Sequence, residues 1–288
     1  MGIQVLPMWV DPLSYRFLRG AGLVPAHLGR GPIILMYHSV SDGRDSSVNH
    51  WSVSVKNFRS HIRLLKSKGW TTVCVKNLIQ AYSLPQRTVA ITFDDGYADN
   101  FEHAFRVLSE FGMSATWFIV SNDIGTQASW KDNDNLKQRM LNLTQLKEMI
   151  NAGMEIGAHT RTHARLTELS PAEIKEEVAG SKKDLEDMLG VQITSFAYPY
   201  GLFNDECVET VRKAGFTIAC TTRTGWFGSE PDLLRARRVS VFYEDSLSVF
   251  ARKIAFADND VSWPRMTRYM FARLRDRLLV SQQKNNNV

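Results

Sequence analysis

Two adjacent carboxylates, Asp94 and Asp95, are the first residues whose type and spacing could do chemistry. They stand in the segment Thr-Phe-Asp-Asp-Gly-Tyr at residues 92–97, directly after an apolar, β-rich run at residues 89–93. Neighbouring negative charges repel each other, and a divalent cation bound to one carboxylate relieves the repulsion while the other stays free for proton transfer. The dipeptide is equally typical of a solvated turn in which Asp caps a helix and Gly96 allows a tight backbone. Alone it leaves both interpretations open.

A pair of histidines, His159 and His163, has the spacing of a metal site. The pair stands in His-Thr-Arg-Thr-His, after a β-rich run at residues 154–158. A spacing of four puts two imidazoles on one side of a helical turn, and neutral imidazole suits zinc and related ions. Two surface histidines in a loop would look the same. Together with one Asp, however, the pair makes a three-ligand set that leaves a position open for water and substrate.

A third cluster, Phe-Ala-Tyr-Pro-Tyr-Gly at residues 196–201, also follows a β-rich run. Pro199 stiffens the backbone, so that a neighbouring N–H could point at a reacting oxygen, and the tyrosine rings could form flat walls for a sugar. The plain alternative is a rigid turn with core aromatics. Parallel α/β folds place their reactive groups at the carboxyl ends of strands, where all three clusters fall.

The elements that must position these residues alternate along the chain. Apolar, β-rich runs are followed by amphipathic or charged stretches, which is typical of an α/β domain around a parallel sheet. The runs occupy residues 33–37, 71–75, 89–93, 115–120, 154–158, 195–198, 217–220 and 237–242. Helices are expected at residues 55–68, 98–111, 144–151, 172–189, 205–214 and 246–256. The pattern predicts a barrel of βα units, although a doubly wound open sheet would read almost the same. Residues 121–143 have no strong apolar period and are expected to form a long loop or a weak helix over one rim of the sheet.

The three clusters, in this order, resemble the first three motifs of the polysaccharide deacetylases, also called the NodB-homology family or carbohydrate esterase family 4. The resemblance covers roughly residues 31–245. It implies a distorted (β/α)7 TIM-like barrel and a metal-dependent hydrolase that removes acetyl groups from N-acetylated bacterial glycans. It also implies site roles: Asp94 as the catalytic base, Asp95, His159 and His163 as ligands of one divalent ion, and the Tyr200 backbone N–H as a donor to the oxyanion. Zinc is the expected ion, with Co, Ni, Mn or Fe as alternatives.

The chain departs from the family pattern at two places. The family's late Leu-x-His motif is missing, because no His follows His163. An early Met-Tyr-His ends the first predicted strand and resembles a circularly permuted subgroup, so His38 is expected to be the general acid. Ala197 stands where many members have an Arg that orients the catalytic Asp, and Arg237 or Arg238 could substitute for it in space. Trp226 is either the family's pocket-wall Trp or a core residue.

Charge and composition narrow the remaining possibilities. The 35 basic and 30 acidic residues give a net charge of +5, and residues 262–288 carry this whole excess. A basic tail on a neutral body argues against a nucleic-acid-binding domain. We therefore expect an N-terminal extension at residues 1–30, a catalytic domain at residues 31–257, and a basic amphipathic tail at residues 258–288. The tail is either a terminal helix docked on the barrel with a solvated charged face or a segment that contacts an anionic membrane surface.

The sequence shows neither a readable signal peptide nor an apolar membrane span, so a cytoplasmic protein is expected, peripheral on the inner membrane if the tail binds it. Three unpaired cysteines agree with a reducing compartment. Two other functions stay open: a hydrolase of the same fold that acts on another amide or imide, and a catalytically decayed glycan-binding module.

Overall fold

The computed structural model describes residues 31–42, 50–130, 138–262 and 264. The strands within these residues are β1 (Ile33–Tyr37), β2 (Ser39–Ser41), β3 (Ser52–Ser54), β4 (Thr71–Val73), β5 (Thr88–Phe93), β6 (Thr116–Ile119), β7 (Glu155–Ala158), β8 (Ser195–Ala197), β9 (Ile218–Cys220) and β10 (Val239–Ser240). The α-helices are α2 (Val55–Ser67), α3 (Arg106–Phe111), α4 (Leu143–Asn151), α5 (Pro171–Leu189), α6 (Asp205–Lys213) and α7 (Leu247–Phe256). Short helical turns are η1 (Val75–Ser83), η2 (Phe101–Phe105), η3 (Ser121–Asp123), η4 (Leu166–Glu168), η5 (Pro199–Gly201) and η6 (Leu233–Arg235).

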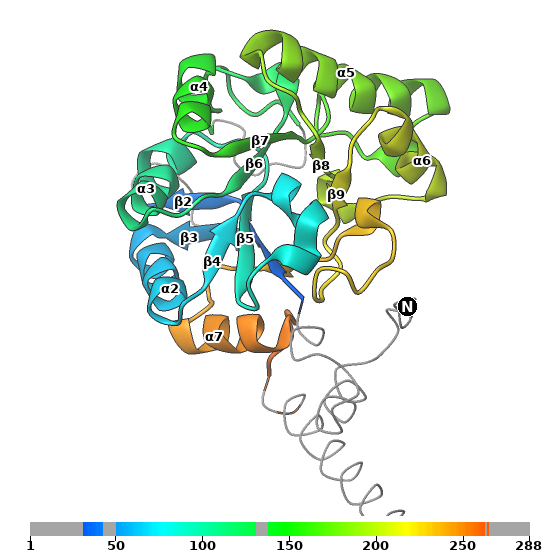
Figure 1. Ribbon diagram of the computed structural model, residues 1–288. Coiled ribbons are helices and arrows are strands. Elements are labelled where there is room, and N and C mark those ends of the chain that lie inside the picture. Colours follow the sequence, from blue (N-terminus) through cyan, green and yellow to red (C-terminus); the bar gives the residue numbers. More distant parts are fainter. Residues whose placement is uncertain (1–30, 43–49, 131–137, 263, 265–288) are drawn as a thin grey trace, which may run out of the picture.

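The main sheet is parallel and curls into a barrel (Figure 1). Its order is β10-β1-β5-β6-β7-β8-β9, and β4 pairs with β5. Residues 236–240 bridge the two ends of this order: Ala236 pairs with Cys220 of β9, and Val239 of β10 pairs with Leu35 of β1. The predicted α/β barrel is confirmed, and the open doubly wound alternative is wrong because this segment joins the first strand to the last.

A buried apolar cluster fills the middle of the barrel interior. Its side chains come from alternate strand positions and from η1, which contributes Val75 and Leu78. Gly157 lies inside this layer, and a Cβ there would stand 2.6 Å from the Phe118 ring, so the missing side chain lets that ring fill the barrel. The opposite face of each strand packs against the helices, as Ile33 and Leu35 do.

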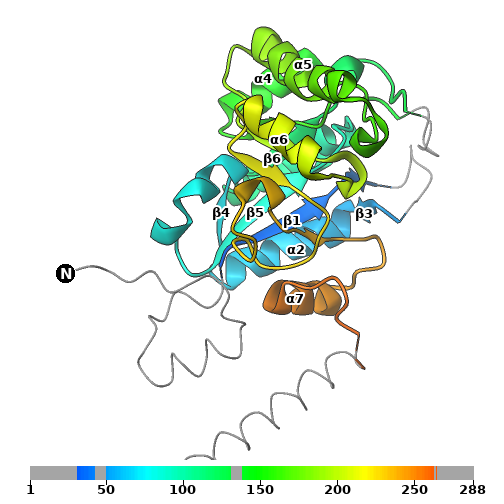
Figure 2. The ribbon, with the colours of Figure 1, turned by 90° about the vertical axis from the view of Figure 1, so that its right-hand side faces the viewer.

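Helices cover the outside of the sheet, and α7 packs beside α2 at one end of the layer (Figures 1 and 2). The best-defined is α5: Ser170 and Glu173 form a capping box, Pro171 occupies the first turn, and Gly190 ends the helix at φ 69°. This matches the pattern read from the sequence. The expected helix at residues 98–111 is divided into the π-helical segment η2 and the α-helix α3.

Of the expected loop at residues 121–143, the structure describes residues 121–130 and 138–143, which are mostly loop and begin with the turn η3. Isolated bridges join Gln127 to Arg139 and Tyr97 to Met140. The expected N-terminal extension and nearly all of the basic tail lie outside the described residues. Within the described residues, no helix is both long and apolar enough to cross a membrane.

Candidate functional site

The chemically active residues gather at one edge of the barrel, where the parallel strands end. Asp94 and Asp95 follow β5, His159 follows β7, and Tyr200 lies in η5 after β8. The backbone is strained here: among the described non-glycine residues with positive φ are Asp95 (72°), Thr160 (67°), His163 (59°) and Tyr200 (58°). Such conformations are unfavourable for residues with a Cβ and cluster at functional sites.

Asp95, His159 and His163 converge on one point. The Oδ1 atom of Asp95 lies 3.4 Å from His159 Nε2 and 3.3 Å from His163 Nε2. All three side chains are buried, and one ligand atom from each lies within 4.8 Å of the others. Burial alone would raise the pKa of Asp95, but the two imidazoles that face its carboxylate hold the pKa well below its usual range.

This donor set fits a divalent cation. Asp95 Oδ1 is buried and accepts no hydrogen bond, although two ring nitrogens face it. Zinc lies about 2.0–2.2 Å from nitrogen and oxygen ligands in a tetrahedral site, which separates two ligand atoms by about 3.3–3.6 Å. The observed oxygen–nitrogen distances have this length. One carboxylate and two imidazoles are also a common set for zinc and its neighbours.

The imidazoles are held by their surroundings. His159 Nδ1 lies 2.8 Å from the Ala197 carbonyl oxygen, which can only accept, so Nδ1 carries the proton and Nε2 presents a lone pair to the site. His163 lies between two aromatic rings, with centroids 4.6 Å from Trp130 and 4.5 Å from Tyr200. These contacts restrict the orientation of both rings.

Asp94 has a different partner, the guanidinium of Arg238. Two hydrogen bonds of 2.7 Å join Arg238 Nη1 and Nη2 to the two carboxylate oxygens. Arg238 is fully buried and also donates from Nε to the Thr221 carbonyl. Burial alone would raise the pKa of Asp94, but the charge and hydrogen bonds of Arg238 hold it below the usual range. Asp94 is therefore kept as an oriented carboxylate.

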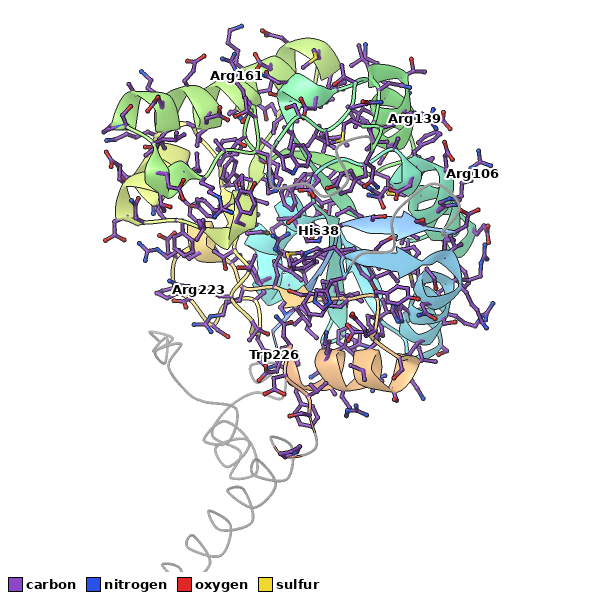
Figure 3. All side chains as sticks on the ribbon, turned by 180° about the vertical axis from the view of Figure 1, so that it is seen from behind. His38, Arg106, Arg139, Arg161, Arg223 and Trp226 are labelled. Carbon is purple, nitrogen blue, oxygen red and sulfur yellow. The ribbon has the colours of Figure 1, made fainter. Side chains whose placement is uncertain are left out.

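Of the two arginines that could orient Asp94, the structure places Arg238 there. Arg237 donates instead to Glu230, with Nε at 3.0 Å. Trp226 packs against the main hydrophobic core, as the core interpretation expected. Figure 3 shows it at the lower edge of the fold, well away from His38.

His38 follows β1 at the same edge of the sheet and is partly buried. Its ring centroid lies 4.4 Å from that of Trp51, and its buried Nδ1 has no hydrogen-bond partner. Burial lowers the pKa of His38, while the charges of Asp95 and Asp94 act in the opposite direction. The carboxylates of the site are therefore close enough to affect its protonation.

Sequence reasoning missed two residues that shape the site. Trp130, which packs on His163, lies in the loop after β6, where no periodicity marks it. Asn100 is fully buried and donates from Nδ2 to the His38 carbonyl oxygen at 2.6 Å. Only its position shortly after the two carboxylates could have drawn attention to it.

Comparisons with known proteins identify the family and the fold of this chain. The polysaccharide deacetylase family model matches residues 81–219. The Bacillus subtilis (strain 168) protein YxkH, named as a polysaccharide deacetylase, is 34% identical over 225 residues, which cover 77% of this chain and 75% of YxkH. The poly-β-1,6-N-acetyl-D-glucosamine N-deacetylase of Staphylococcus aureus (strain MSSA476) is 30% identical over 180 residues, covering 58% of this chain and 60% of that enzyme. The crystal structure of BC0361, a polysaccharide deacetylase from Bacillus cereus, has a TM-score of 0.68 and 29% identity, covering 78% of this chain and 69% of that one. The curled parallel barrel thus matches the fold of the Bacillus cereus deacetylase, and the chain belongs to the polysaccharide deacetylase family of enzymes.

Proposed function

We propose that this chain is a metal-dependent hydrolase that removes N-acetyl groups from an N-acetylated glycan, with residues 31–257 as the catalytic unit. Water is consumed, the amide bond is broken, and acetate and a free amine are released. One observation carries the proposal: Asp95 faces two imidazoles at the spacing of shared ligands, while the adjacent Asp94 is held as a carboxylate by Arg238. A relative named for N-deacetylation of a glucosamine polymer supports the substrate class.

Asp95, His159 and His163 would hold the divalent ion. When bound, such an ion polarises an acetyl carbonyl and lowers the pKa of a water molecule toward about 7. Zinc is the first choice for this set, with Co, Ni, Mn and Fe as the other candidates.

The other residues of the site would move protons and stabilise charge. Asp94, anionic and aimed by Arg238, takes a proton from the attacking water. The backbone N–H of Tyr200 donates to the acetyl oxygen as negative charge develops on it. His38 returns a proton to the leaving nitrogen. Burial lowers the pKa of His38, and the proton that Asp94 takes from the attacking water balances the one that His38 gives to the leaving nitrogen.

The test combines metal content with product identity. Purified protein should contain about one divalent ion per chain, and His159→Ala should contain none because a ligand is lost. Wild-type protein should release acetate from β-1,6-linked oligomers of N-acetylglucosamine, and a chelator should stop the release. Ammonia without acetate would instead indicate the hydrolase of another amide or imide. Absence of both metal and turnover after incubation with zinc would overturn the proposal in favour of a binding module.

A further inference from the structure

The loop that carries both imidazoles, residues 159–163, has a conformation that its own sequence does not favour. Thr160 and His163 both have positive φ, and neither is a glycine. A strained backbone persists only where surrounding structure holds it in place. The contacts that hold this loop therefore also hold the two candidate ligands.

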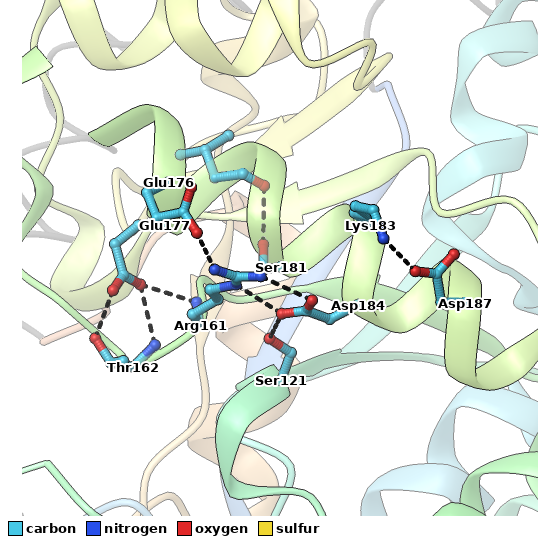
Figure 4. Close-up of polar contacts among 10 residues, drawn as sticks. Ser121, Arg161, Thr162, Glu176, Glu177, Ser181, Lys183, Asp184 and Asp187 are labelled. Carbon is cyan, nitrogen blue, oxygen red and sulfur yellow. Dashed lines mark hydrogen bonds and ion pairs between the residues drawn. The ribbon is translucent and has the colours of Figure 1, made fainter. Parts of the chain in front are cut away.

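One set of contacts comes from α5 (Figure 4). The Arg161 side chain, which lies between the two histidines in sequence, makes a two-pronged ion pair with Asp184: Nε to Oδ2 at 2.7 Å and Nη2 to Oδ1 at 2.8 Å. Its Nη1 donates to Glu176. On the same helix, Glu177 accepts from the backbone N–H groups of Arg161 and Thr162, at 2.9 and 3.0 Å.

The opposite side of the loop is held by η3. The backbone N–H of Ser121 donates to the Thr160 carbonyl at 3.2 Å, and that of Asn122 donates to the Arg161 carbonyl at 3.0 Å. Ser121 Oγ also donates to Asp184 Oδ2 at 3.3 Å. The loop is thus clamped between two elements, and Asp184 contacts both the loop and η3.

The helix makes room for the arginine at one position. Gly180 lies in the middle of α5, where glycine disfavours the helical conformation. A Cβ at this position would stand 2.5 Å from Arg161 Nε and 2.6 Å from Cζ. The guanidinium therefore lies flat against the helix in a space that any larger residue would fill.

We propose that Arg161 is a positioning residue: its attachment to α5 through Asp184, over Gly180, sets the geometry of His159 and His163 and thereby the affinity for the divalent ion. The inference rests on the metal site of the proposed function. The two charged side chains are 26% and 25% exposed. Their two parallel hydrogen bonds hold the guanidinium in one orientation against α5, and with it the loop that carries both histidines.

The experiment measures the zinc dissociation constant of the full chain by competition with a chromophoric chelator. Arg161→Ala should bind zinc about tenfold more weakly, the low end of the range for residues that orient metal ligands. Asp184→Asn should do the same, and the double variant should lose little more, because both changes break one interaction. Arg161→Lys keeps the charge without the planar fork and should recover part of the affinity.

Gly180→Ala separates positioning from general stability. Alanine favours the helix, so the melting temperature of the metal-free protein should not fall, yet zinc binding should weaken because the Cβ displaces the guanidinium. Lys183→Ala is the matched control: Lys183 pairs with Asp187 on the same helix, exposed to solvent, and its loss should leave zinc binding unchanged.

The possible failures are distinguishable. If the wild-type chain binds none of the candidate divalent ions, zinc included, and shows no turnover, the proposed function itself is wrong. If it binds zinc and Gly180→Ala and Asp184→Asn bind it equally well, the metal site stands and the role of Arg161 is refuted. Should Arg161→Ala not fold, these two variants still decide the question.

Discussion

Two buried polar clusters lie on either side of the end of β1, and only one of them has the properties of an active site. Tyr37 points toward the helices, and its hydroxyl oxygen lies 3.2 Å from His61 Nδ1, next to the buried ion pair of Asp245 and Lys253. We call these four residues the helix-side cluster. His38, the next residue along the chain, belongs to the site cluster with Asp94, Asp95, His159 and His163. Both clusters contain histidine and carboxylate, and each has a buried cation paired with a carboxylate: Lys253 in the helix-side cluster and Arg238, beside Asp94, at the site cluster.

The clusters differ in how their polar atoms are used. In the helix-side cluster, Lys253 Nζ donates to Asp245 Oδ2 at 2.6 Å and to the Ser240 carbonyl at 3.0 Å, and His61 stacks on Phe250. None of its members is among the described residues with positive φ. In the site cluster, ligand atoms face each other without hydrogen bonds on a strained backbone. Burial with shifted pKa values is therefore insufficient to identify a site, whereas converging unpaired atoms on strained backbone indicate one.

The largest expected effect is on turnover in the site cluster. Asp94→Asn should lower kcat by about 10³-fold, because the proton acceptor is lost, while zinc affinity stays within about twofold of wild type. Acetate release and zinc titration measure the two quantities, and circular dichroism checks the fold. His159→Ala is the contrasting variant and should lose both. Full activity of Asp94→Asn would show that another group is the base.

Removing the partner of Asp94 should affect both stability and pH dependence. Arg238→Met leaves a fully buried carboxylate without its cation and should lower the free energy of unfolding by about 4 kcal/mol. Because Arg238 holds the pKa of Asp94 down, its loss should raise that pKa. Asp94 would then be ionised only at higher pH, so the acidic limb of the kcat profile should move to higher pH. An unshifted limb would mean that Asp94 does not set it.

The equivalent change in the helix-side cluster should affect stability alone. Lys253→Met leaves the Asp245 carboxylate buried without its cation. This change should lower the free energy of unfolding by about 3 kcal/mol, measured by urea denaturation. Adding Asp245→Asn should restore part of this loss, because a neutral amide is less costly to bury. Activity per folded molecule should equal that of wild type. A lower kcat in a fully folded variant would show that the helix-side cluster also contributes to catalysis.

His38 follows Tyr37 in the chain, and His61 lies beside the Tyr37 hydroxyl in space, so substituting each histidine tests the two clusters separately. His38→Ala should lower kcat by about 10²-fold with little change in zinc affinity, because proton donation to the leaving nitrogen is lost. Substrates with better leaving amines should lose less, since they need less protonation. An unchanged rate with the acetylated glycan would reject His38 as the acid.

Much of the site could be predicted because parallel strands end at one edge of a sheet. Asp94, Asp95, His159 and His163 each follow a β-rich run, so the strand pattern alone brings them together. The arginine that orients Asp94 could be predicted only as either Arg237 or Arg238. Neighbouring residues point to opposite faces of a strand, and β10 is too short for its sequence to show which face each occupies. Trp130 and Asn100 reach the site from a loop and the start of a helical turn, where no periodicity shows direction. The three-residue strands β2 and β3 were missed because they are too short for a pattern.

The smallest expected effect is a pH-dependent one on the helix-side cluster. Burial lowers the pKa of His61 to about 4, against about 6.5 in an unfolded chain. Below about pH 6.5 the unfolded chain therefore binds a proton that the folded protein does not, so His61 makes the free energy of unfolding fall as pH falls. Between about pH 7.5 and about pH 5 this loss is about 2 kcal/mol, and it levels off below about pH 4, where the folded protein becomes protonated as well. The difference between wild type and His61→Asn, measured by denaturation across this range, should show that slope. Equal slopes for wild type and His61→Asn would show that burial does not keep His61 neutral in the folded protein. The difference between the structural His61 and the catalytic His38 would then rest on turnover alone.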